Sequence, residues 1–156
     1  MTRDQVERML KQDEGFSSRV YLDSKGIPTV GWGHALFGAD APKVGTEFTK
    51  EQCEILFQQD LNSAYAVYGR LGLPDISPAV RGVIVQMLFN LGLYGVLKFK
   101  RFLAAVREKD YKLAAFEMLD SKWHREDVKK RAVRLARIVF NAKLISLARM
   151  IDGSKE

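Results

Sequence analysis

The feature that most constrains the fold is a nearly unbroken apolar run that extends from Ala79 to Leu91. Ser77 and Pro78 come before it, as a helix cap and a first-turn proline would. A helix that is apolar on most of its faces has to be buried, because it offers water no polar face. The run therefore predicts the core helix of a helical lobe, with breaks in the chain at Gly92 and Gly95.

Helical signals flank this run on both sides. A one-sided apolar stripe predicts a helix over residues 3–13, and a capping box of Thr49 and Gln52 opens a helix that continues to about residue 71. At about six turns, this second helix is long enough to join two lobes. Three further helices are expected, over 98–107, over 110–120 and over a long basic amphipathic stretch at 127–150.

Residues 19–34 favour strands, because β-branched and aromatic side chains are concentrated there around a Ser24-Lys25-Gly26 turn. They predict a small antiparallel sheet, and residues 35–48 predict a loop. The predicted fold class is α+β, mainly helical, in a single domain of residues 1–156. Its parts are a sheet lobe of about 14–60, the joining helix, and a helical lobe of about 72–156 plus the helix 3–13.

Size and cysteine content narrow the class of protein. A length of 156 residues suits one domain or two small lobes that share a core. Cys53 is the only cysteine, so an intrachain disulfide is excluded, and with two histidines we expect no metal site and no cofactor. We expect no apolar run long enough to span a membrane. The polar N-terminus differs from a signal peptide, which predicts synthesis in the cytosol.

Charge is distributed unevenly along the chain. Residues 1–95 carry a net charge of −2, whereas residues 96–156 carry +8, from 16 lysines and arginines and 8 acidic residues. A basic C-terminal half favours a polyanionic partner such as the cell envelope or a nucleic acid. A solvated basic helix surface explains the same pattern equally well. No helix-turn-helix, zinc or RNA-binding sheet signature supports a nucleic-acid partner.

Two carboxylates carry the strongest chemical signal. Glu14 lies at the end of the first predicted helix, Asp23 enters a glycine-containing turn nine residues later, and Thr29 follows six residues after that. Carboxyl groups in unequal surroundings can differ in pKa, so that one acts as an acid and the other as a base. Hydrolysis of a glycosidic bond needs that division of roles. Taken singly, Asp23 is also a typical turn residue and Thr29 a typical strand residue.

The segment around these carboxylates resembles a known family. Met9-Leu10-Lys11-Gln12-Asp13-Glu14-Gly15, followed by Tyr21, Asp23, Gly26, Thr29, Gly31, Gly33 and His34, is similar to the N-terminal motif of the phage-type lysozymes of glycoside hydrolase family twenty-four. Further similarities extend over nearly the whole chain, at Phe57–Leu61, Met87–Gly92, Ser121-Lys122-Trp123 and Arg131-Ala132. The chain departs from the family pattern in a shorter loop over 35–48, one residue inserted between Trp123 and Arg131, and a longer, more basic last helix.

The resemblance implies a lysozyme-like fold with an active-site cleft between the two lobes. It also implies an endo-N-acetylmuramidase, which cleaves the β-1,4 bond between N-acetylmuramic acid and N-acetylglucosamine in peptidoglycan with inversion. Glu14 would be the general acid, and Asp23 and Thr29 would position and activate the attacking water. Inversion requires the two carboxyl groups to lie about 6.5–9.5 Å apart, which leaves room for that water.

The resemblance also assigns supporting residues. It pairs His34 with Asp60 across the lobes, and it brings Arg131 toward Glu14, with Lys130 as a competitor because of the inserted residue. It places five residues along the substrate groove, namely Ala35, Phe89, Asn90, Phe102 and Glu117.

Three residues of the sheet segment are interpreted from their own chemistry. Gly31 and Gly33 would let the strand backbone approach a sugar closely. Trp32 is interpreted as a packing residue rather than a sugar-stacking ring, because aromatic side chains on small sheets usually serve the core.

For its biological role, the resemblance implies lysis of a bacterial host by a monomer. The enzyme would stay in the host cytoplasm until a holin-type membrane protein released it to peptidoglycan, with peripheral contact to the anionic envelope. Two alternatives stay open, a lytic transglycosylase and a catalytically silent wall-binding module of the same fold. A transglycosylase needs only one acid/base carboxyl, so Asp23 and Thr29 argue against it, and all three residues together argue against a silent module.

Overall fold

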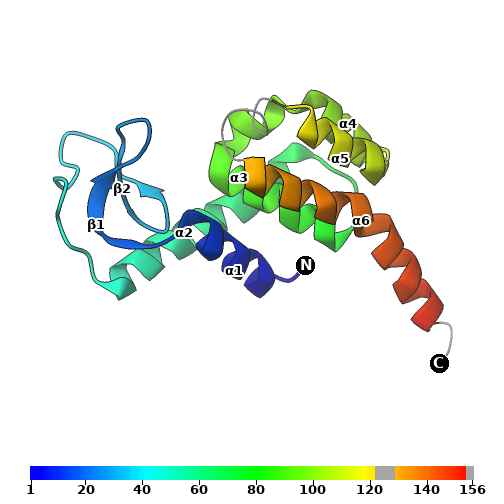
Figure 1. Ribbon diagram of the computed structural model, residues 1–156, viewed down its shortest axis with the longest axis horizontal. Helices are drawn as coiled ribbons and strands as arrows, with labels where there is room; N and C mark the ends of the chain where they lie inside the picture. Colours follow the sequence, from blue (N-terminus) through cyan, green and yellow to red (C-terminus); the bar gives the residue numbers. More distant parts are fainter. Residues whose placement is uncertain (122–128, 154–156) are drawn as a thin grey trace.

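The sheet occupies one end of the molecule and most of the helices occupy the other, with one long helix running between them (Figure 1). The structure is a computed structural model that describes residues 1–121 and 129–153, with residues 143–153 as backbone alone. Lys122 and Trp123, two residues of the resemblance, lie outside the described residues.

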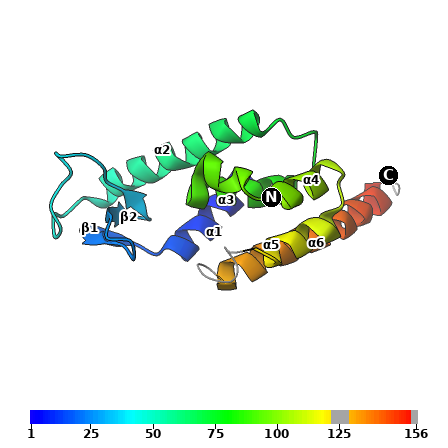
Figure 2. The ribbon, with the colours of Figure 1, turned by 90° about the horizontal axis from the view of Figure 1, so that it is seen from above.

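The described residues contain six α-helices. Their bounds are α1 (Arg3–Glu14), α2 (Lys50–Tyr68), α3 (Pro78–Leu97), α4 (Lys100–Arg107), α5 (Tyr111–Leu119) and α6 (Lys129–Gly153), with a short 3-10 helix, Gly69–Leu71, directly after α2. These bounds agree closely with the predicted ranges. Seen from above, α2 runs from the sheet lobe along the helical lobe (Figure 2).

Two of the predicted helix starts are confirmed at the level of hydrogen bonds. The hydroxyls of Thr2 and Thr49 accept from the backbone N–H of Gln5 and Gln52, and each glutamine side chain accepts from its cap's backbone N–H. The expected side-chain cap at Ser77 is wrong, because its hydroxyl makes no capping hydrogen bond. Pro78 alone marks that start, by fixing the first-turn backbone.

The predicted sheet is confirmed as three antiparallel strands in the order β1 (Ser17–Leu22), β2 (Pro28–Gly31) and β3 (His34–Ala35). Tyr21 pairs with Thr29, and Thr29 pairs with Ala35. Because directly opposite residues share a face of the sheet, these three side chains lie in one row.

Helix α3 is the core helix that the apolar run predicts. Its residues from Val83 to Val85 and Met87 are fully buried. By length and mean hydropathy (1.5) α3 could cross a membrane, so the expectation that no segment qualifies is wrong. Its burial against other helices accounts for that composition, since core helices of globular proteins are equally apolar. The expected break occurs at Gly92, which has φ 70° and ψ 175°, whereas Gly95 stays helical.

Apolar side chains form two separate clusters. The larger one centres on α3 and includes Val6 and Leu10 of α1 as well as Leu135 and Val139 of α6. The smaller one lies under the sheet and joins Val20, Val30 and Cys53. Trp32 packs against both clusters, so one side chain bridges the sheet lobe and the helical lobe. The mainly helical α+β architecture predicted from the sequence is therefore confirmed.

Candidate active site

Glu14 is the last residue of α1, and its side chain is mostly buried beside three groups from other parts of the chain. Gly15 ends the helix with a positive φ of 67°. The amide of Asn90, on α3, donates to Glu14 Oε1 at 3.4 Å. Arg131, in the first turn of α6, places Nη1 2.9 Å from the same oxygen, as an ion pair without an aligned hydrogen bond. The carboxyl is thus held by α1, α3 and α6 together.

The neighbouring Asp13 joins the same cluster of charges. Its Oδ2 lies 3.4 Å from Arg131 Nε and accepts a hydrogen bond from Arg134 Nη2. The side chains of Asp13 and Arg131 are 8% and 11% exposed, so the pair is well shielded from water. Arg131 therefore bridges Asp13 and Glu14. The competitor Lys130 is exposed and makes no ion pair with a described residue, which agrees with the role expected of Arg131.

Gly33 packs directly against the Glu14 carboxyl. A Cβ at this position would lie 3.0 Å from Glu14 Oε2, and the residue has φ 79°. Gly31 similarly faces the side chain of Cys53, at 3.1 Å. At both positions a protein side chain lies close to where a Cβ would be, so the structure gives each glycine a packing role. Glycine is required at residue 33 by both its backbone angle and the proximity of Glu14.

Asp23 lies in the turn between β1 and β2, and its carboxylate organises that turn. Oδ1 accepts from the backbone N–H groups of Lys25 and Ile27, at 2.8 and 2.9 Å. Gly26 completes the turn with φ 76°, and its N–H donates to the backbone carbonyl of Asp23. The turn interpretation is therefore confirmed, and Oδ2 makes no hydrogen bond with a described residue. The turn hydrogen bonds fix the position of the carboxylate through Oδ1 and leave Oδ2 available to another partner.

Thr29 is buried in β2, in the row that also contains Tyr21 and Ala35. Its hydroxyl donates to the backbone carbonyl of Ile27 at 2.9 Å, which leaves the oxygen lone pairs as acceptors. Ala35 sits opposite it on β3. The sheet pairing thus brings one predicted catalytic residue and one predicted groove residue side by side.

The phenol of Tyr21 is affected by the charges of both carboxylates. Partial burial raises the pKa of its phenol, and the negative charges of Glu14 and Asp23 raise it further. Both carboxyl groups therefore lie close enough to act on one side chain, although they belong to a helix end and a turn. The sequence motif contains Tyr21, but its spacing alone did not single this residue out as part of the site.

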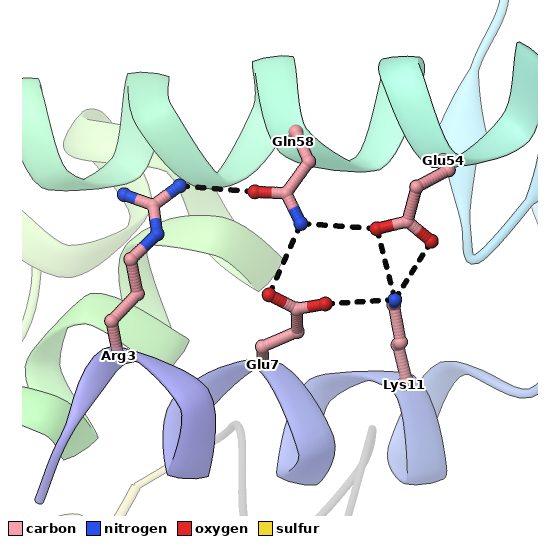
Figure 3. A network of polar contacts seen from close by, with 5 residues as sticks. All are labelled: Arg3, Glu7, Lys11, Glu54 and Gln58. Atoms are coloured by element: carbon pink, nitrogen blue, oxygen red, sulfur yellow. Dashed lines mark hydrogen bonds and ion pairs between the residues drawn. The ribbon is translucent and has the colours of Figure 1, made fainter. Parts of the chain in front are cut away.

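A polar network fixes α1, and with it Glu14, against α2 (Figure 3). Lys11 Nζ donates to Glu7 at 2.8 Å and to both carboxylate oxygens of Glu54 at 2.8 and 3.0 Å, and the Gln58 amide donates to the same two glutamates. Burial acts to lower the pKa of Lys11, but these hydrogen bonds outweigh it, so the pKa is raised. Lys11 Nζ also lies over the ring of Trp32, 4.5 Å from its centre.

Trp32 is a packing residue in this structure, in agreement with its interpretation from the sequence. Its ring centre lies 4.7 Å from that of Phe16 and 5.7 Å from that of Phe57. With Lys11 over one of its faces, Trp32 links the sheet to both α1 and α2.

The predicted groove residues on α3 and beyond line two pockets. Phe89 lines a pocket of about 230 Å³ together with Asp60. Phe102 and Glu117 line a larger pocket of about 480 Å³, and Leu91 of α3 lines the same pocket. Phe102 is only 1% exposed, so it belongs to the floor of that pocket. Asn90, which contacts Glu14, lines neither of these two pockets.

His34 and Asp60 form the ion pair that the resemblance implied. His34 Nδ1 lies 2.8 Å from Asp60 Oδ2, which links β3 to α2. The hydrogen bond and charge of Asp60 raise the pKa of His34, against a smaller opposing effect of burial. Cys53 is buried on α2. The described residues contain no group of three or more potential metal ligands.

Replacing His34 by asparagine should reduce stability in a pH-dependent way. Because the folded pKa of His34 is raised, the pair stabilises fully below the unfolded histidine pKa of about 6.5, and its contribution disappears as pH rises through the folded pKa. Thermal unfolding of wild type and His34→Asn should therefore differ at pH 5.5 and converge at pH 9. An equal difference at both pH values would contradict a pH-dependent pair.

Two residues of the site, Asp13 and Arg134, are absent from the sequence-based assignment. A signal existed, because two adjacent carboxylates at a helix C-terminus repel each other and the helix dipole, and so need cations nearby. The sequence offered many arginines in the last helix and no means to select Arg134 as the partner of Asp13.

The chain is similar in sequence to several known proteins. The chain is 28% identical over 164 residues to the pre-baseplate central spike protein Gp5 of Enterobacteria phage T4, covering 90% of this chain and 28% of that protein's length. It is 29% identical over 145 residues to a probable T4-type lysozyme of Dictyostelium discoideum, covering 78% and 85% of the two chains. An endolysin of Salmonella phage P22 is 29% identical over 84 residues, which cover 53% of this chain and 58% of the endolysin.

The profile of the phage lysozyme family matches residues 11–137. That range contains every residue that forms the candidate site, from Asp13 and Glu14 to Arg134. The chain therefore belongs to the phage lysozyme family and is a glycoside hydrolase of the lysozyme type.

Proposed function

We propose that the chain is an endo-N-acetylmuramidase that hydrolyses the β-1,4 bond between N-acetylmuramic acid and N-acetylglucosamine with inversion. The observation that carries the proposal is the setting of the Glu14 carboxyl, which lies against Gly33 of the sheet lobe and contacts Asn90 and Arg131 of the helical lobe. The charges of both Glu14 and Asp23 also raise the pKa of Tyr21, so the two carboxyl groups lie near one side chain, which suits acid and base catalysis on one bond.

Glu14 is the proposed general acid. In its protonated form it would donate to the glycosidic oxygen as the bond breaks. Asn90, Arg131 and Gly33 surround this carboxyl and restrict its orientation, which keeps the proton donor in place for the leaving group.

Asp23 and Thr29 are the proposed residues for the attacking water. Asp23 Oδ2 has no hydrogen-bond partner among the described residues, so it can accept a proton from water. The Thr29 hydroxyl donates to Ile27 and therefore offers its lone pairs to the same water. A nucleophilic water on the side opposite the leaving group inverts the anomeric carbon.

The saccharide strand is proposed to pass over Asn90, between Ala35 of the sheet lobe and α3. Phe89 and Glu117 would contact it from the two pockets that they line, and Phe102 would support the floor of the larger pocket. His34, Asp60 and Arg131 would support the site without contacting the sugar.

In the cell, we place the enzyme among monomeric lytic lysozymes that act on the wall after a membrane-permeabilising partner has released them. The support is the similarity to proteins named endolysins, in Salmonella phage P22 and as a SAR-endolysin in Enterobacteria phage P21.

Digestion of purified peptidoglycan, analysed by mass spectrometry and by NMR of the first-formed anomer, tests the reaction. Reducing-end muramic acid with the α-anomer formed first is the expected product. An anhydro-muramic product would establish a transglycosylase, and the β-anomer would exclude inversion. Asp23→Asn is the matched variant, because its amide oxygen can keep the two turn hydrogen bonds while the charge is lost. It should stay folded and lose activity.

A further inference from the structure

The side of α6 that faces away from Glu14 has an unusual composition. From Val128 to Ile151 the sequence contains no acidic residue. Lys130, Val133, Arg137 and Phe140 are all exposed on this helix, although two of them are apolar. Val133 and Arg137 line a shallow surface depression together with Lys130. The exposed face thus alternates cations with apolar side chains.

Helix α5 extends this surface. It packs along α6, as Figures 1 and 2 both show. Lys112 of α5 places Nζ 5.8 Å from the centre of the Phe140 ring. Phe116 lies one turn further along α5, on the same side as Lys112. Phe116 is 63% exposed and Phe140 is 46% exposed, so two phenyl rings face solvent.

These six residues define what we term the α5–α6 face, consisting of Lys112, Phe116, Lys130, Val133, Arg137 and Phe140. Its three cations make no ion pair with any residue in the described ranges, 1–121 and 129–153. The face therefore combines free positive charge with exposed apolar surface. That combination is typical of protein surfaces that lie in the headgroup region of anionic membranes, where cations meet phosphates and apolar side chains enter the acyl boundary.

The position of the face relative to the active site is favourable for such docking. Phe140 follows Arg131 by nine residues, which is about two and a half helical turns, so the two side chains leave α6 on opposite sides. Arg131 points to Glu14. A molecule resting on the α5–α6 face would therefore keep its catalytic residues directed away from the membrane.

We infer that the α5–α6 face docks the protein on a bilayer surface rich in anionic phospholipid. Charge complementarity favours an anionic partner, and the two exposed phenyl rings favour a lipid surface over a purely polar polyanion. The inference does not depend on the proposed reaction. It adds a membrane-bound position for an enzyme whose substrate lies beside the membrane.

Co-sedimentation with vesicles tests the inference. The full chain should bind vesicles that contain phosphatidylglycerol, and should not bind phosphatidylcholine vesicles. Phe116→Ser with Phe140→Ser, which keeps all cations, should lower the partition coefficient at least tenfold. Lys130→Glu with Arg137→Glu should lower it similarly. Circular dichroism should show intact folding, because all four side chains are exposed.

Matched controls come from exposed side chains of the sheet lobe and the start of α2. Phe37→Ser with Val44→Ser removes apolar surface comparable to that of the two phenylalanines. Lys25→Glu with Lys50→Glu reverses two positive charges, as Lys130→Glu with Arg137→Glu does. Neither control pair should reduce vesicle binding by more than twofold. Glu14→Gln should bind vesicles like wild type, and the double serine variant should cleave purified peptidoglycan like wild type. Failure of docking is thereby separated from failure of the proposed reaction.

Several results would overturn the inference. They are no binding to anionic vesicles, binding that the double serine variant retains in full, or equal losses in the control pairs. A concentration-dependent dimer in sedimentation velocity that the double serine variant abolishes would instead identify a second copy as the occupant.

Discussion

Replacing Glu14 by glutamine should leave a folded protein that has lost nearly all hydrolytic activity. Glutamine has almost the same shape and can keep a polar contact with Asn90, but it has no acidic proton to give the leaving sugar oxygen. General acid catalysis typically contributes roughly 10²- to 10⁴-fold to rate, so a loss of that size is expected. Release of soluble fragments from purified peptidoglycan measures it directly.

The control for this variant is Glu51→Gln, in the exposed first turn of α2, which removes a carboxylate far from the site. It should keep full activity. Thermal unfolding of both variants shows whether the fold is intact. A well-folded Glu14→Gln protein that retains more than a tenth of wild-type activity would refute the assignment of Glu14 as the acid.

Replacing Arg131 by methionine should reduce both stability and activity. The change leaves Glu14 without an ion-pair partner among the described residues and leaves Asp13 with Arg134 alone. Removing one partner of a buried ion pair typically costs about 3–5 kcal/mol, and the partial exposure of Glu14 places the expected loss below that range, at about 2–3 kcal/mol. In a domain of this size that lowers Tm by roughly 4–12 °C. Activity should fall because Glu14 loses its orienting contact.

Lys130→Met is the matched control, because this neighbour is exposed and makes no ion pair with a described residue. Its effect on the free energy of unfolding should stay within about 0.5 kcal/mol. Calorimetry of the two variants at pH 7 compares them. An Arg131→Met protein with wild-type Tm would show that the cluster adds no stability.

The elements that the sequence predicted well are those specified by local chemistry. The capping box at Thr49, the Asp23 turn and the break at Gly92 depend on residues a few positions apart. The apolar run of α3 was equally clear, because residues 82–88 are buried on every face of the helix, which leaves little freedom in composition. By contrast, Gly95 stayed helical despite its low helix propensity, since packing within the lobe outweighs a cost of about 1 kcal/mol.

The parts of the site that the sequence did not predict depend on contacts between distant segments. Nothing near Asp13 indicates that Arg134 is its partner, and nothing near Phe102 indicates that it lies beneath a pocket. The family resemblance supplied Arg131 and the pair of His34 with Asp60 for the same reason. Long-range pairing is set by how helices pack, which a single sequence specifies only through the whole fold.

The contact of α1 with α6 constrains the order in which the molecule can mature on the ribosome. Asp13 and Arg134 are 121 residues apart, and Val6 and Leu10 pack in the same cluster as Leu135 and Val139. Helix α1 packs on α3, but the charges of Asp13 and Glu14 at its end are paired only when α6 has been synthesised. Until α6 emerges, Glu14 lacks its ion pair with Arg131. A nascent chain can therefore fold its sheet lobe before the surroundings of the Glu14 carboxyl are complete.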